Sequence, residues 1–310
     1  MSSSPRVTES SVRTRTIASL QRNLSRTQSA QDQISSGKQL RRPSDSPTGT
    51  VTALQLRGEV RANKKYSANA DDAIGRLGTV QDSLRSVSDS LQRVRTLTLE
   101  AANAGGGSTP QANRARAEQV EEIKGLLVQY ANTKYLDRPV FGGSTPDSTA
   151  YTTAGEYAGE NAGQTLRAIG PNAKIRVDVR GPEVFGPEEV TVNGSTVPNE
   201  AQLFRVLDSL AAAMRDGNAE GINAGLSNLD KATEILNSTL SDVGARYNRV
   251  EQMKQSAEDR LMSVSSQLSD IEDVDLPKAI MELQLQQTSY QAALAATAKV
   301  IQPSLIDFLR

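Results

Sequence analysis

The chain has 310 residues with 4% aromatics, a formal net charge of −1, and no histidine, cysteine or tryptophan. The absence of cysteine excludes disulfides and thiolate chemistry, and the absence of histidine removes the commonest metal ligand and general base. These absences argue against most hydrolytic and zinc enzymes, and no apolar run approaches the roughly 20 residues of a membrane span. A composition so low in aromatics is typical of helical rods and bundles.

The small net charge conceals a strong asymmetry along the chain. Residues 1–65 carry twelve Lys/Arg against four Asp/Glu, whereas residues 251–282 carry eight acids against three bases. A basic N-terminal arm is compatible with nucleic-acid binding, but it lacks interleaved aromatics and a known binding motif. We favour the interpretation that a basic helix lies against an acidic one. The N-terminus also lacks an apolar core segment, so we expect no cleavable secretory signal.

The first half of the chain predicts three helices. Residues 8–36 form a thin amphipathic helix, with Ile17, Leu20, Leu24 and Ile34 on one side, and Gly37 as its C-cap. Ser46 is a candidate N-cap with Pro47 at the first helical position. A long helix follows from about Gly58 to Ala104 and ends at a glycine run. A third helix begins at Pro110 and continues to about Tyr135.

The character of the chain changes from Phe141 to about Val197. Lys174–Val179 alternates polar and apolar residues like a half-buried strand, and Asn193-Gly194 between two Val/Thr runs is a hairpin signal. This segment is predicted to be a small β-rich insert. A helix follows, with Asn199 as N-cap, Gln202 at the reciprocal position and Gly217 at its end.

The strongest pattern is a heptad repeat from Ile222 to Ile271. Apolar residues recur there at alternating steps of four and three, interrupted only at Thr233 and Lys254. This repeat indicates a supercoiled helix roughly 75 Å long. Pro277 interrupts it, and a last helix is predicted from Ile280 to the terminus.

The order of these elements is nearly a palindrome, so the two chain ends are expected to meet. We predict a mainly α fold, namely a long antiparallel helical bundle or coiled-coil rod built from both ends, with the β-rich insert at its tip. Residues 1–45 and 275–310 form a terminal helical assembly domain. Residues 46–140 and 199–274 form a long-helix rod domain, and residues 141–198 form the insert domain.

Candidate chemical motifs are weak. The adjacent acids Asp71-Asp72 and Glu121-Glu122 lie on helices, where neighbours point about 100° apart, and they are interpreted as solvated faces, as is Glu188-Glu189. The glycine run 105–107 lacks the Lys-Ser/Thr of a phosphate loop. We therefore expect no catalytic, cofactor-binding or metal-binding residue. Gly58, Gly75, Gly78 and Gly244 lie inside helices and either permit close helix approach or are incidental.

Several motifs at both ends of the chain resemble the flagellin family, over roughly 6–143 and 199–310. The matching motifs are Ile34–Lys38, Arg42–Asp45, Asn69, Ala131-Asn132, Tyr135, Phe141–Gly143, Val243–Glu251, Asp273–Asp275, Gln287, Tyr290–Ala292 and Ser304–Arg310. The closing Ser304–Leu309 stretch is closer to the branch of hook–filament junction proteins than to filament flagellins. Leu136–Val140 departs from the family pattern, which usually contains glycine there.

The resemblance implies a structural, non-enzymatic adapter at the junction between the hook and the filament of the bacterial flagellum. Such a protein is exported through the flagellar type III apparatus without a cleavable signal. Its partners are the first hook-associated protein, flagellin, further copies of itself in a ring, the export apparatus and an export chaperone. No nucleic acid, small molecule, cofactor or membrane insertion is implied. Filament flagellin is the alternative, and a cytoplasmic coiled-coil signalling or nucleic-acid-binding rod is a remote third.

Overall fold

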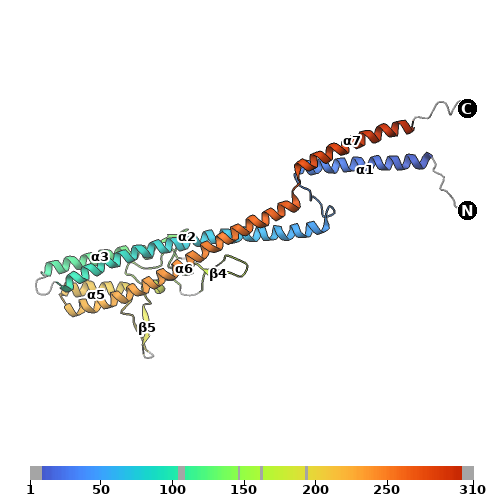
Figure 1. Ribbon diagram of the computed structural model, residues 1–310. Coiled ribbons are helices and arrows are strands. Elements are labelled where there is room, and N and C mark those ends of the chain that lie inside the picture. The colour runs from blue at the N-terminus through green and yellow to red at the C-terminus, as the bar shows by residue number, and fades with distance from the viewer. Residues whose placement is uncertain (1–8, 104–108, 146, 161–162, 193–194, 302–310) are drawn as a thin grey trace, which may run out of the picture. The chain divides into compact units, whose positions relative to one another are not determined.

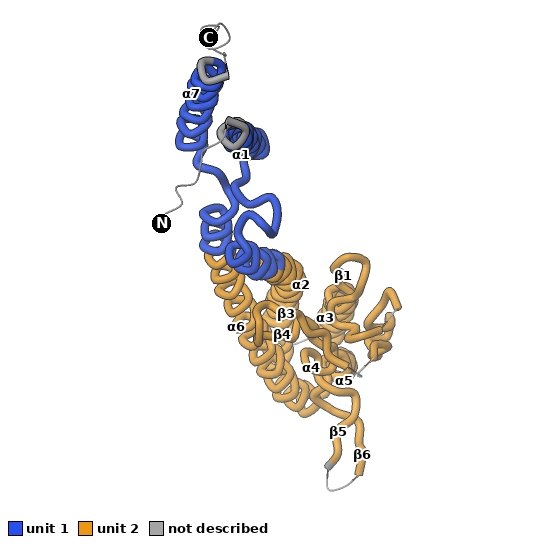
Figure 2. Tube along the Cα trace, turned by 90° about the vertical axis from the view of Figure 1, so that its right-hand side faces the viewer, with its two compact units in different colours: residues 1–61, 261–310 blue, residues 62–260 orange. Residues whose placement is uncertain are grey.

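The structure is a computed structural model that describes residues 9–103, 109–145, 147–160, 163–192 and 195–301. The chain divides into two compact units (Figure 2). Unit 1 contains residues 1–61 and 261–310, and unit 2 contains residues 62–260. The glycine run 105–107, the Asn193-Gly194 turn and the motif Ser304–Arg310 lie outside the described residues.

The described chain is mainly helical. Its long helices are α1 (Glu9–Ser36), α2 (Pro47–Asn103), α3 (Pro110–Ala131), α5 (Leu203–Asp216), α6 (Ala219–Glu272) and α7 (Leu276–Ile301), and α4 (Gly181–Phe185) is a single short turn. Six short strands form three antiparallel pairs: β1 (Lys134–Tyr135) with β2 (Arg138–Pro139), β3 (Leu166–Ala168) with β4 (Lys174–Arg176), and β5 (Glu189–Val192) with β6 (Ser195–Pro198). The predicted mainly α fold with a small β insert is confirmed.

In unit 1, α1 and α7 lie side by side (Figure 1). Helix α1 ends at Gly37, whose φ of +67° is the left-handed conformation that glycine adopts without strain. The Ser46 hydroxyl accepts a hydrogen bond from the Gly49 amide at 3.2 Å, so Ser46 caps α2 as predicted. Helix α7 begins beside Asp275, whose carboxylate accepts from the Lys278 amide at 3.2 Å.

The heptad seam of α6 finds its partners inside the chain. Within unit 2 its buried side chains recur at seven-residue intervals, including Leu229, Leu236, Val243 and Val250. They share one core with the buried stripe of α2, which contains Leu77, Val80, Leu84, Val87, Leu91 and Val94. At the break in the repeat, Lys254 reaches out of the seam to Asp71 of α2, with its ammonium 2.7 Å from the carboxylate. The repeat therefore builds a two-helix scaffold, to which α3 and α5 add a second pair.

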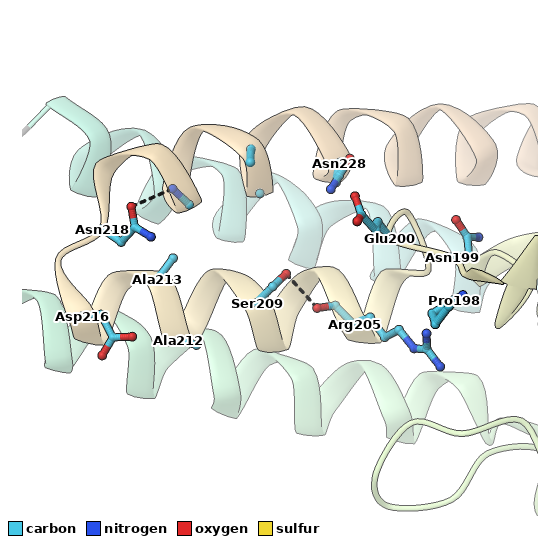
Figure 3. Close-up of a pocket in the computed structure, with 13 residues that line it drawn as sticks. Pro198, Asn199, Glu200, Arg205, Ser209, Ala212, Ala213, Asp216, Asn218 and Asn228 are labelled. Carbon is cyan, nitrogen blue, oxygen red and sulfur yellow. Dashed lines mark hydrogen bonds between the residues drawn. The ribbon is translucent and has the colours of Figure 1, made fainter. Parts of the chain in front are cut away.

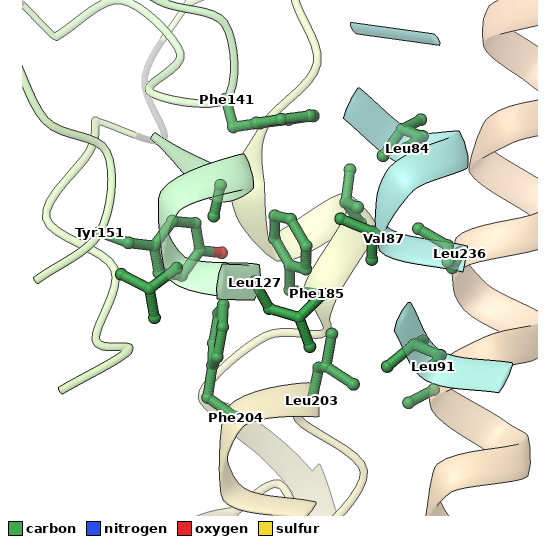
Figure 4. Close-up of a cluster of buried hydrophobic side chains, with 14 of the residues drawn as sticks. Leu84, Val87, Leu91, Leu127, Phe141, Tyr151, Phe185, Leu203, Phe204 and Leu236 are labelled. Atoms are coloured by element: carbon green, nitrogen blue, oxygen red, sulfur yellow. The ribbon is translucent and has the colours of Figure 1, made fainter. Parts of the chain in front are cut away.

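An aromatic cluster joins the insert to this scaffold (Figure 4). Phe185 contacts Phe141 and Tyr151 edge-on, with ring centroids 5.5 and 5.3 Å apart, and it stacks obliquely with Phe204 of α5 at 5.5 Å. All four rings are at most 2% exposed. Figure 4 shows Phe185 lying between Tyr151 on one side and Val87 of α2 on the other. These rings contain most of the large aromatic surface that the chain buries, so they stabilise the otherwise strand-poor insert.

The insert does not lie at the tip of the long helices, contrary to expectation. Asn69 of α2 donates to the Ala168 carbonyl at 2.7 Å, and Thr239 of α6 donates to the Glu183 carbonyl at 2.8 Å. Both helical residues lie far inside their helices. The insert therefore flanks the α2–α6 pair, because the side of a helix pair offers a broad apolar surface for the aromatic cluster, whereas the end of the pair does not. The β5–β6 hairpin projects from unit 2 (Figure 2).

Three predicted helix boundaries are wrong. Helix α2 is continuous from Pro47 and does not begin at about Gly58. Helix α3 ends at Ala131 and not near Tyr135, because the Asn132 side chain turns to the insert. Its amide oxygen accepts from the backbone amides of Ala150 and Tyr151 at 2.7 and 2.9 Å. Helix α5 is capped by Gln202 and not by Asn199, whose side chain donates to the Pro187 carbonyl at 2.8 Å. In the last two places an asparagine makes a tertiary contact that local pattern does not reveal.

Candidate assembly surface

Helices α1 and α7 pack antiparallel through a thin seam. The least exposed side chains recur at steps of four and three, which is the spacing of a coiled-coil contact. On α1 they are Thr16, Leu20, Asn23, Thr27, Ala30 and Ile34, and on α7 they are Ala279, Leu283, Gln286, Tyr290, Ala293 and Thr297. Of the described side chains of these two helices, only Ala30 and Ala279 are buried. A seam made largely of small and polar residues buries little apolar surface, so it stabilises the pair only weakly.

Several large apolar side chains of the pair face solvent. They are Ile17 and Leu24 on α1, and Leu276, Ile280, Met281, Leu285 and Leu294 on α7, all between 43% and 68% exposed. Residues 283–298 of α7 contain no charged side chain at all. A surface helix normally carries charges on its solvent face. An exposed helix that is apolar and uncharged over this length is typical of a surface that a protein partner covers.

The two connectors that lead to these helices are tied together. The Gln39 amide donates to the Glu272 carbonyl at 2.8 Å, and the Val274 amide donates to the Gly37 carbonyl at 3.0 Å. Lys38 and Asp273 thereby form an antiparallel bridge. The chain segments that enter α2 and leave α6 are consequently held in one register, which sets where α1 ends relative to where α7 begins.

A cluster of charged side chains, here called the Glu272 hub, reinforces this bridge. It consists of Lys38, Arg57, Glu272 and Asp273. Arg57 Nε lies 2.6 Å from one carboxylate oxygen of Glu272, and Lys38 Nζ lies 3.4 Å from the other and 2.5 Å from Asp273. The Glu272 side chain is only 5% exposed, whereas its two cationic partners are about half exposed. A buried carboxylate of this kind requires its cations, because an unpaired charge there is costly.

The hub perturbs the ionisation of its members. The hydrogen bond from Arg57 holds the pKa of Glu272 below its ordinary value of 4.5. The hydrogen bond from Lys38 likewise lowers the pKa of Asp273, and Asp273 raises the pKa of Lys38. Sequence reasoning did not single out this cluster. The available signal was that acids and bases adjoin both helix breaks, at Gly37 and before Pro277.

No catalytic arrangement emerges among the described residues. Most of the adjacent acids are exposed, as expected, and three of them pair with separate cations: Asp71 with Lys254, Asp72 with Arg167 and Glu121 with Arg215. In the same part of the chain, no group of three acidic residues is arranged to hold a metal ion. None of the described helices is both long enough and apolar enough to cross a membrane.

A shallow groove of 520 Å³ lies between α5 and α6 in unit 2 (Figure 3). Small residues form much of it, including Ala212, Ala213, Gly221 and Gly225. Helices α5 and α6 approach each other closely at Gly225, where a Cβ would lie 2.4 Å from a Leu210 methyl carbon. The Ser209 hydroxyl bonds to the Arg205 carbonyl of its own helix at 2.9 Å. No buried charge or unpaired polar atom among its described residues gives this groove the character of a chemical site.

Comparison with known proteins finds matches at both ends of the chain. The bacterial flagellin N-terminal helical region matches residues 8–143, and the bacterial flagellin C-terminal helical region matches residues 226–309. Flagellar hook-associated protein 3 of Escherichia coli is 26% identical over 283 residues, which cover 86% of this chain and 87% of that protein. Flagellin of Bacillus subtilis is 26% identical over 296 residues, or 93% of each chain.

Solved structures share the fold. A structure described as a flagellar hook-associated protein from Vibrio parahaemolyticus aligns with a TM-score of 0.63 at 19% identity, covering 74% of this chain and 100% of that one. The flagellar junction protein of Legionella pneumophila aligns with a TM-score of 0.57 at 15% identity, covering 71% and 99%. The two helical regions that define the family thus include both partners of the α1–α7 pair, and the chain belongs to the bacterial flagellin family.

Proposed function

We propose that this chain is a structural adapter at the hook–filament junction of the bacterial flagellum. The observation that carries the proposal is the α1–α7 pair, two long helices that expose an uncharged apolar surface and bury almost none of it in their own chain. A pair of this kind gains stability mainly when neighbouring subunits cover it. Relatives named as hook-associated proteins over most of both chains support the junction as the place of assembly.

The proposed role involves no catalysis. The chain acts as a structural part of the assembly. Its terminal helices, residues 1–45 and 275–310, are proposed to order against other subunits. The remaining helices and the insert 141–198 are proposed to form the outer body. Its proposed partners are the first hook-associated protein, flagellin and further copies of itself in a ring. Export is proposed to use the flagellar type III apparatus with a chaperone, after which the protein is extracellular.

Filament flagellin is the second candidate. The Bacillus subtilis relative supports it, because it matches this chain at the same identity as the Escherichia coli hook-associated protein and over more of the length. A filament protein polymerises without limit, whereas an adapter stops after one layer. Seeded growth of the purified chain into long filaments would therefore favour flagellin.

The deciding experiment is an in-frame deletion in the source bacterium, complemented by the wild-type chain. We expect intact hooks without filaments by electron microscopy, together with filament subunits in the culture medium. The subunits accumulate because they are still exported but have nothing to polymerise on. Hooks that lack filaments while no other filament protein appears in the medium would indicate that this chain is the filament protein itself. Normal filaments in the deletion strain would refute both candidates.

A further inference from the structure

The terminal helices separate positive from negative charge along their length. Arg15, Arg22 and Arg26 are the only charged residues between positions 14 and 31. All three are exposed, and no ion pair joins them to another described residue. Spacings of seven and four residues place them on one flank of α1, beside the seam with α7. This row is here called the arginine flank.

No acid among the residues that the structure describes forms an ion pair with the arginine flank. Counting along both helices from the Lys38–Asp273 bridge, the three arginines lie level with residues 283–298 of α7, which carry no charge. The expectation that the basic N-terminal segment lies against an acidic one is met by Lys38 and Arg57, which pair with Glu272, but not by the three arginines of α1. The basic helix lies against an uncharged one, and the nearby acids are concentrated at the connector end of the pair.

Those acids line a cleft in unit 1. The cleft has a volume of 580 Å³ between the connectors, the last residues of α6 and the first turns of α7. Asp45, Asp275 and Glu282 lie exposed along it, and Lys278 is its only basic lining residue. Asp275 and Glu282 are seven residues apart, which is the spacing of Arg15 and Arg22 on α1. Two helical turns thus separate the charges of each pair, so both pairs can meet at once when the helices lie side by side.

We propose that the arginine flank of one copy docks against the carboxylate cleft of a second copy, placing Arg15 beside Glu282 and Arg22 beside Asp275. This inference deepens the proposed function and rests on it, since it specifies how copies associate at the junction. The pairing is antiparallel, like the α1–α7 pair itself, and it shifts the second copy along the helix axis by roughly 20 Å. The two surfaces differ and lie on one molecule, so the contact is head-to-tail and continues into a ring or helical layer.

A second copy fits these surfaces better than an unrelated anion. Each chain carries both surfaces with the same residue spacing, and arginine forms two-pronged hydrogen bonds with carboxylates. The contact leaves the opposite flank of α1, which presents Ile17 and Leu24, free for other subunits.

The absence of cysteine makes a direct test possible. Full-length single-cysteine variants, one carrying Arg15→Cys and the other Glu282→Cys, are mixed on hooks isolated from the deletion strain and oxidised. The expected product is a disulfide dimer between the two variants. The control replaces Arg15→Cys by Gln21→Cys, which lies on the opposite flank of the same helix and should give about tenfold less dimer. Equal yields from both mixtures would overturn the proposed contact.

Charge exchange tests the electrostatics. Arg15→Glu should reduce binding to isolated hooks about tenfold, because it replaces an attraction with a repulsion. Adding Glu282→Arg in the same chain should restore most of the loss, whereas Gln28→Glu, on another face of α1, should have little effect. If Arg15→Glu binds as well as the wild type, the proposal is wrong. A nucleic-acid partner is tested with duplex DNA. If the wild-type chain binds DNA in a salt-dependent manner and the arginine-to-glutamine variants do not, the proposed contact between copies is also overturned.

Complementation of the deletion strain distinguishes a failure of this contact from a failure of the proposed function. If the wild-type chain restores filaments in the deletion strain but Arg15→Glu does so equally well, the adapter role stands and the contact is refuted. If the deletion strain already grows normal filaments without the wild-type chain, the adapter role fails. The disulfide yield of concentrated protein without hooks then still shows whether the two surfaces meet.

Discussion

Replacing Glu272 by glutamine should loosen the connection between the two chain ends. The substitution keeps the size of the side chain and the carbonyl that accepts from Gln39, but removes the charge that faces Arg57 and Lys38. Hydrogen bonds to charged groups contribute roughly 1.5–3 kcal/mol each. Because both cations are about half exposed, solvent screens their charges and allows them to rehydrate. We therefore expect a local destabilisation of about 2 kcal/mol in total.

Hydrogen exchange at single amides measures this effect directly. The amides of Gln39 and Val274 form the bridge between the connectors, so their exchange reports its opening. A loss of about 2 kcal/mol corresponds to exchange that is roughly 30-fold faster. Asp270→Asn is the matched control. Asp270 is a neighbouring exposed acid outside the hub, so the substitution removes the same single negative charge without changing a hub residue. An exchange rate at Gln39 within twofold of the wild type in Glu272→Gln would refute the assigned role of the hub.

The same hub predicts a pH dependence with a defined sign. The pKa of Glu272 is lowered in the folded chain, so its ion pairs contribute stability that is fully present above its ordinary value of 4.5. That contribution is lost as the pH falls below 4.5 through the lowered pKa. Protection of the Gln39 and Val274 amides should therefore decrease in acid. In Glu272→Gln the decrease should be smaller and should begin at lower pH, because only Asp273 remains to titrate.

Three substitutions, one at the end of α3 and two within α2, test other parts of the fold. Asn132→Ala should lower the free energy of unfolding of unit 2 by about 2–4 kcal/mol, because it leaves the amides of the insert without their acceptor, and thermal denaturation measures this. Gly75→Ala should be destabilising by about 1 kcal/mol despite better helix propensity, because its Cβ would lie 2.6 Å from the Tyr135 hydroxyl oxygen. Gly58→Ala, with no atom within 4 Å of the added Cβ, should instead stabilise α2 by up to about 1 kcal/mol. An equal effect of the two alanine substitutions would contradict the close approach at Gly75.

The helix ends show how far local chemistry extends. Gly37 and Gly217 adopt the left-handed conformation with which helices often end, and Ser46 caps α2 through its hydroxyl, all as predicted. These features depend on a few neighbouring residues, so the sequence predicts them well. The end of the third helix near Tyr135 and the cap at Asn199 were predicted by the same local rules and are wrong, because the side chains of Asn132 and Asn199 bond to other segments of the chain.

The assembly surface was predicted only in part. The thin stripes of the terminal helices correctly indicated that these helices bury little apolar surface in their own chain, yet the side chains expected to form the inner face are partly outside. Ile17, Leu24 and Leu294 are exposed, while Asn23, Ala30 and Ala279 lie in the seam. With so few apolar residues, several helix orientations bury similar areas, so the pattern alone does not choose among them.

The sequence by itself determined the family, the helical class and the long α2–α6 scaffold, because a heptad repeat over many turns can be satisfied in few ways. It also determined that catalysis by histidine or cysteine is excluded. Only the tertiary structure decided that the insert flanks the helices, that Glu272 joins the two connectors, and that Arg15, Arg22 and Arg26 pair with no acid among the described residues. Each of these depends on which distant segments meet, and composition and periodicity carry no information about such pairings.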